Sequence, residues 1–171
     1  MKFDFFRVFL FVFSVFSITC PQSQASNSAQ LAEDKINQVD VSIRLLNMDD
    51  EIHREPLRAY QQILTLENTF SDMPKLQQLW WLLRKAQAEN LLYFYSDFNK
   101  TVVQAIALID AETPAIIQSN IYIFQGLAFR RDAKYADSTL VFRKAMSIAK
   151  AEKLTYLFII AKQEIAYIKS L

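Results

Sequence analysis

Few side chains in this sequence could carry out chemistry, and the only histidine stands next to an acidic run in the sequence. His53 is the only histidine, and it stands between the acidic run Asp49–Glu51 and Arg54. A single histidine excludes a metal centre built on several histidines, and its charged neighbours favour a solvent-exposed residue over a catalytic base. The acidic run could bind a cation weakly, but it lacks the alternating ligands and the turn glycine of a calcium loop. We therefore predict no metal site.

Glycine-dependent chemistry is excluded as well. The chain has one glycine, Gly126, whereas phosphate-binding loops, dinucleotide-binding turns and glycine-based nucleophile elbows need several. No pattern of nucleophile and base stands out elsewhere in the chain. We therefore predict that the protein is not an enzyme and uses no cofactor.

The first 25 residues have the pattern of a secretory signal peptide. Lys2 and Arg7 provide a basic start, and an apolar run follows over residues 8–19. This run is too short to span a bilayer about 30 Å thick comfortably as a helix, and small residues before Ala25 suit cleavage after it. We expect a periplasmic or secreted domain over residues 26–171, with an uncleaved anchor as the alternative.

Cys20 is the only cysteine and could in principle carry a lipid anchor. The residues before it, Ser17–Thr19, resemble a lipoprotein cleavage motif poorly, so we do not expect lipidation. Cleavage after Ala25 would leave a mature chain without cysteine. Disulfide bonds and thiol catalysis would then be excluded.

Composition predicts an all-α domain without a nucleic-acid surface. Hydrophobic residues make up 52% of the 171, while one Gly and four Pro are too few turn residues for a many-stranded β protein. The net charge is +1, and without residues 1–25 the basic and acidic residues balance. A nucleic-acid-binding protein would show a clustered basic excess instead.

Apolar residues recur at helical spacing through the rest of the chain, and about seven helices are predicted. We expect the polar run 47–55 to interrupt the chain after the first helix, and Ser71 to cap the third. The predicted helices cover about 29–46, 56–68 and 71–95, begin near Phe98 and Pro114, cover 135–151, and begin near Leu154.

Small and aromatic residues recur at fixed spacing in the stretch 120–152, which fits two helices joined by a turn at 131–134. Phe142 and Ala145 are expected to lie between these helices and the next. The stretch resembles a tetratricopeptide repeat, a helix–turn–helix unit of about 34 residues, although Tyr122, Gln125 and Ser138 depart from the family pattern. The small and aromatic positions of the pattern are taken by Gly126, Phe129, Tyr135, Ser138, Phe142 and Ala145, where Ser138 replaces alanine.

The resemblance implies a right-handed superhelix of antiparallel helix pairs over residues 98–170. In the preceding repeat we place Phe98 at the position of Tyr135, 37 residues earlier, so that Glu89 replaces the small residue. With an export signal and a divergent first pair, the chain is similar to the periplasmic sensor region of bacterial membrane-bound diguanylate cyclases. It contains neither the transmembrane helix nor the GGDEF domain that follow in that family, so the cyclase activity is not carried over.

We expect an exported, non-catalytic module that binds a protein or peptide, or alternatively the truncated sensory region of a diguanylate cyclase. One residue of the Trp80–Trp81 pair should fill the core, while the other faces a partner. The predicted contacts are exposed residues on the first helices of the pairs: Trp81, Asn90, Tyr122 and Gln125.

The last predicted helix is expected to mediate self-association through 154–171. It carries Phe158, Ile159, Ile165 and Ile168, and an apolar patch of this kind marks an interface or an aggregation site. It is either a polar cap or the last part of a truncated solenoid, and these two interpretations stay open.

Overall fold

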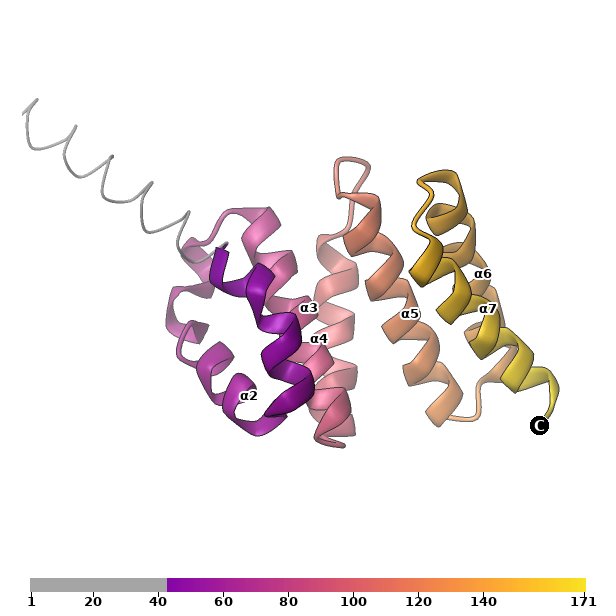
Figure 1. Ribbon diagram of the computed structural model, residues 1–171, viewed down its shortest axis with the longest axis horizontal. Coiled ribbons are helices and arrows are strands. Elements are labelled where there is room, and N and C mark those ends of the chain that lie inside the picture. The colour runs from indigo at the N-terminus through magenta and orange to yellow at the C-terminus, as the bar shows by residue number, and fades with distance from the viewer. Residues whose placement is uncertain (1–42) are drawn as a thin grey trace, which may run out of the picture. The chain divides into compact units, whose positions relative to one another are not determined.

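The structure is a computed structural model that describes residues 43–171, and its regular elements in this range are all helices (Figure 1). No strand occurs in this range, so the predicted all-α class is confirmed there. The predicted signal peptide, Cys20 and the start of the first predicted helix lie outside it. After a helix over 43–54, the elements are α2 (Pro56–Leu64), the 3-10 helix η1 (Glu67–Asp72), α3 (Lys75–Leu91), α4 (Tyr95–Leu108), α5 (Ala115–Arg131), α6 (Tyr135–Ala151) and α7 (Thr155–Lys169).

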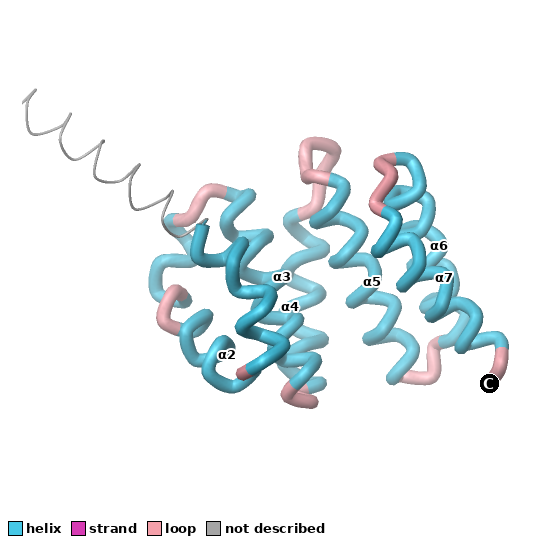
Figure 2. Tube along the Cα trace, viewed as in Figure 1, coloured by secondary structure: helices cyan, strands magenta, loops and turns pink. Residues whose placement is uncertain are grey.

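The helices from α3 onward repeat with a period of 40 residues. The starts of α3 and α5 lie at 75 and 115, those of α4 and α6 at 95 and 135, and that of α7 at 155. The turns repeat too, because Tyr93 and Ala133 both have positive φ, at 61° and 56°. The next amide donates back to a carbonyl five residues earlier in each turn, as in a Schellman motif. Figure 2 shows the short loops that connect α3 to α4 and α5 to α6 at these turns.

This period corrects the predicted register of the earlier repeat. Tyr95, not Phe98, occupies the position of Tyr135 at a helix start, while Phe98 is fully buried and corresponds to the buried Ser138. The small residue equivalent to Gly126 is therefore Ala86, not Glu89. The 37-residue spacing was wrong because Phe98 was matched to Tyr135 by its aromatic type, whereas Tyr95, three residues earlier, is the exposed equivalent and Phe98 is buried.

The predicted start of α3 was also wrong. Ser71 belongs to η1 and caps nothing, since α3 begins at Lys75 after an extended Pro74 with ψ of 146°. Proline also forces Met73 before it into an extended conformation. The Gln78 amide fixes the turn by donating to the carbonyls of Phe70 and Met73 at 3.1 and 2.9 Å.

The polar run 47–55 does not interrupt the chain as predicted, because residues 43–54 are helical. Three apolar side chains explain the difference. Leu45, Met48 and Ile52 follow one another at spacings of three and four, and all three are buried. A helix with one apolar face and one charged face satisfies both parts of this sequence.

The close approach of α5 and α6 depends on Gly126. A Cβ built there would lie 2.6–2.7 Å from three ring atoms of Phe142, and Ser138 Oγ donates to the Gly126 carbonyl at 2.7 Å. Phe142 and Ala145 are both fully buried in the cluster that joins α5, α6 and α7, so their predicted position is confirmed. In the preceding pair, Ala86 clusters with Phe98 and Val102.

The outer face of α7 is more polar than predicted. Lys162, Gln163 and Ala166 are exposed, although the positions 40 residues earlier, Tyr122, Ile123 and Gly126, are buried. Of the four apolar residues expected on this surface, Ile165 is buried, Phe158 and Ile168 are half-buried, and only Ile159 is exposed. Self-association through this helix stays a prediction.

We predict that Gly126→Ala lowers the melting temperature, although alanine is the better helix former by about 1 kcal/mol. Overpacking a buried site costs about 1–3 kcal/mol, and the fully buried Phe142 ring has little room to shift. Because Ala86 and Val102 form the equivalent pair one repeat earlier, Gly126→Ala with Phe142→Val should be less destabilised than the sum of the two single changes. Thermal melts of the four proteins check this, and a more stable Gly126→Ala protein would contradict it.

Candidate functional site

An open groove of about 570 Å³ lies between the 43–54 helix, α3, α5 and α7. We call it the first-helix groove, because α3, α5 and α7 are the first helices of successive repeats. The same face of each contributes, as the equivalent residues Trp80, Asn120 and Ile160 show. Its lining is Asp49, His53, Trp80, Leu83, Arg84, Gln87, Asn90, Leu91, Ile116, Asn120, Ile123, Phe124, Leu127, Leu154, Thr155, Tyr156, Leu157 and Ile160.

Most of the lining is apolar, and part of it faces solvent. Tyr156 is 74% exposed and Ile116 43% exposed, and both line the groove. Trp80 and Phe124 are half-buried within it. Apolar side chains exposed in a concavity are typical of surfaces that bind a ligand or a partner.

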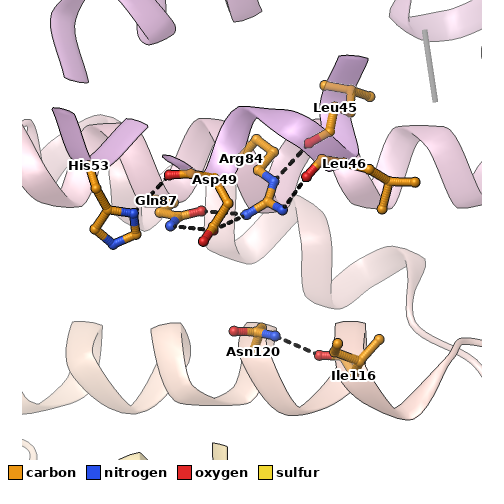
Figure 3. Close-up of polar contacts among 8 residues, drawn as sticks. All are labelled: Leu45, Leu46, Asp49, His53, Arg84, Gln87, Ile116 and Asn120. Atoms are coloured by element: carbon orange, nitrogen blue, oxygen red, sulfur yellow. Dashed lines mark hydrogen bonds and ion pairs between the residues drawn. The ribbon is translucent and has the colours of Figure 1, made fainter. Parts of the chain in front are cut away.

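One wall of the groove is polar and centres on Arg84 (Figure 3). This buried guanidinium donates from Nε to the Leu45 carbonyl at 2.9 Å and from Nη2 to the Leu46 carbonyl at 3.2 Å. Its Nη1 donates to Asp49 Oδ1 and, at 2.8 Å, to Gln87 Oε1. Arg84 thus attaches the 43–54 helix to α3 and positions the wall.

Burial and charge act in opposite directions on this ion pair. Burial opposes ionisation of Asp49, but the hydrogen bond from Gln87 and the charge of Arg84 outweigh it and lower the pKa of the carboxyl below its ordinary value. Burial also lowers the pKa of Arg84, and the Asp49 charge partly offsets this. An arginine remains protonated despite such a shift, so the wall carries a charged pair at neutral pH.

Three other polar side chains of the groove each form a hydrogen bond through one of their polar atoms. His53 Nδ1 donates to the Asp49 carbonyl at 2.8 Å. In the neutral ring, Nε2 is then the unprotonated nitrogen and can accept a hydrogen bond. Asn120 Nδ2 donates to the Ile116 carbonyl at 2.8 Å. Asn90 Oδ1 accepts from Arg131.

The four predicted contact residues differ in their exposure and in whether they line the groove. Trp81 is only 3% exposed, and its Nε1 donates to the Ile63 carbonyl at 2.9 Å. Tyr122 is buried beneath Lys144, whose Nζ lies 4.1 Å from the ring centre. The predicted exposure of these two residues was therefore wrong. Asn90 does line the groove, whereas Gln125 is half-buried and lies outside it.

Sequence reasoning missed most of the groove. Trp80, rather than Trp81, is the residue of that pair that lines it. The 40-residue spacing of Trp80, Asn120 and Ile160 was the available signal, but the assumed spacing of 37 concealed it. Asp49 and His53 were missed because their segment was predicted to be a loop.

Glu89 forms a second buried polar cluster, outside the groove lining. Its fully buried carboxylate pairs with Lys85 at 2.8 Å and accepts from the Tyr60 hydroxyl at 3.5 Å. Burial and the charge of Glu89 raise the pKa of Tyr60. Because Lys85 also donates to Thr101 on α4 at 3.1 Å, the cluster ties α3 to α4 and has a structural role.

No group of three or more His, Cys, Asp or Glu side chains is placed to hold a metal ion within residues 43–171. Among the helices of this range, none is both long enough and apolar enough to cross a membrane.

Asp49 gives a testable pH dependence. Because its pKa is lowered on folding, its ionised form stabilises the fold at pH values above the ordinary pKa of 3.8, and this contribution is lost as the pH falls through the lowered value. We expect Asp49→Asn to lower the melting temperature at pH 7 and to have a smaller effect near pH 3. The control is Asp50→Asn, which should show no such difference, and equal effects of Asp49→Asn at both pH values would contradict the assignment.

Comparison of the chain with protein-family models, with curated proteins and with solved structures finds no match. The case for a function therefore rests on the residues of the first-helix groove themselves.

Proposed function

We propose that this protein is a non-catalytic helical-repeat module that binds a peptide segment of a partner protein in the first-helix groove. The observation that carries this proposal is the open groove of about 570 Å³ with exposed apolar side chains on the same face of three successive first helices. Aromatic and aliphatic side chains in such a groove anchor a partner by burying its apolar residues.

The hydrogen bonding of the groove supports binding without catalysis. His53 donates to a backbone carbonyl, and the Asp49 carboxylate is held by Arg84 and Gln87. Neither residue is hydrogen-bonded to a side chain that could act as a nucleophile. The polar wall is therefore suited to orienting a bound segment.

We also propose that the helix pairs stack as a right-handed superhelix, as the tetratricopeptide resemblance implies. The repeated pairs α3–α4 and α5–α6 support this arrangement, although their 40-residue period is longer than the 34 residues of that family. Export to the periplasm, inferred from residues 1–25, belongs to the same proposal. The groove would serve equally in a stand-alone protein or in the sensory part of a cyclase.

We predict that the purified chain enriches peptides from a random display library and that exposed groove residues decide their affinity. Ile116→Ser and Tyr156→Ser should each weaken a selected peptide about tenfold or more, because each removes an apolar contact worth about 1.5–3 kcal/mol. Fluorescence anisotropy with the labelled peptide measures the change.

Leu140→Ser is the matched control, since Leu140 is 68% exposed on α6 and does not line the groove. It should leave the affinity unchanged, and melting curves should show that all three variants fold. If no peptide is enriched, or if the control weakens binding as much as the groove variants, the proposed function is wrong.

A further inference from the structure

Three polar atoms at the Asp49 end of the first-helix groove are free to accept hydrogen bonds. Asp49 Oδ1 accepts hydrogen bonds from Arg84 Nη1 and, at 2.9 Å, from Gln87 Nε2. The second carboxylate oxygen, Oδ2, remains free. His53 uses Nδ1–H on the Asp49 carbonyl, which leaves the Nε2 lone pair. Asn120 uses its amide nitrogen on the Ile116 carbonyl, which leaves Oδ1.

These acceptors lie on two sides of the same space. Figure 3 shows Asp49 and His53 on the 43–54 helix and Asn120 on α5, across the groove from them. All three side chains line the cavity. A group that enters this end of the groove therefore meets a carboxylate, an imidazole nitrogen and an amide oxygen.

The lining of the groove offers no free cation at this end. Arg84 is its only lysine or arginine, and it is buried with its guanidinium engaged by Leu45, Leu46, Asp49 and Gln87. Gln87 is engaged through both amide atoms. A carboxylate entering here would face the Asp49 charge without a free cation to pair with, whereas a wholly apolar group would leave Asp49 desolvated.

We propose that this end of the groove binds the side-chain ammonium or guanidinium group of a lysine or arginine in the bound peptide, whose apolar residues lie along the groove floor. The inference rests on the proposed function and adds the class of residue that is selected. A lysine ammonium carries three N–H donors, and each of the three acceptors can receive one of them. Each hydrogen bond from the cation is charge-assisted, and the one to Asp49 is also an ion pair.

The test uses a peptide selected from the display library and a copy of it in which the lysine or arginine is replaced by methionine. Asp49→Asn should weaken the basic peptide about tenfold or more, because a hydrogen bond to a charged group contributes about 1.5–3 kcal/mol. It should leave the methionine copy unchanged. Asn120→Leu is the second variant, and it removes an acceptor without changing the charge or the Arg84 contacts.

Asp50→Asn is the matched control, because it removes the same charge from an exposed neighbour that does not line the groove. The inference is overturned if selected peptides lack lysine and arginine, if they are enriched in acidic residues, or if Asp49→Asn and Asp50→Asn have equal effects. If n-butylamine binds as tightly as the peptide, the site recognises free amines, and the inference that its ligand is a peptide side chain is overturned. If peptides without a basic residue bind in the groove, this inference is wrong but the proposed function stands. If no peptide binds at all, both the inference and the proposed function are wrong.

Discussion

The candidate site depends on one buried cation. Arg84 projects from α3 and donates to two backbone carbonyls and one carboxylate of the 43–54 helix. A guanidinium removed from water is stable only when its donors are paired, so these contacts stabilise both the cation and the position of the helix that it holds. Without Arg84, the polar wall would lose its attachment to α3, and the groove would lose the side on which Asp49 and His53 lie.

The second constraint is the 40-residue repeat, which determines which surfaces are available. Each second helix covers one face of its first helix, and Gly126 and Ala86 keep that face small enough for close packing. The adjacent face of α3, α5 and α7 is left uncovered by this arrangement. The groove is therefore a consequence of repeated packing, and its chemistry is decided by the residues at equivalent positions: Trp80, Asn120 and Ile160.

Binding in this groove would combine two interactions with different roles. The apolar floor would supply most of the affinity, because burial of apolar surface is non-directional and scales with area. The acceptors of Asp49, His53 and Asn120 would supply selectivity, since a buried acceptor without a donor costs free energy. A module of this kind would accept varied apolar sequences while it requires a basic residue at one place.

The sequence by itself determined the all-α class, the bounds of the α6 helix and the buried positions of Phe142 and Ala145, because helical periodicity and side-chain size are local properties. It did not determine the register of the repeats, the helicity of 43–54 or the exposure of Trp81 and Tyr122. These depend on which neighbours each helix face meets in the folded chain. Only the tertiary structure brought Asp49 and His53 opposite Asn120, because the contacts of Arg84 with Leu45 and Asp49 join segments 35 or more residues apart, beyond the reach of any local pattern.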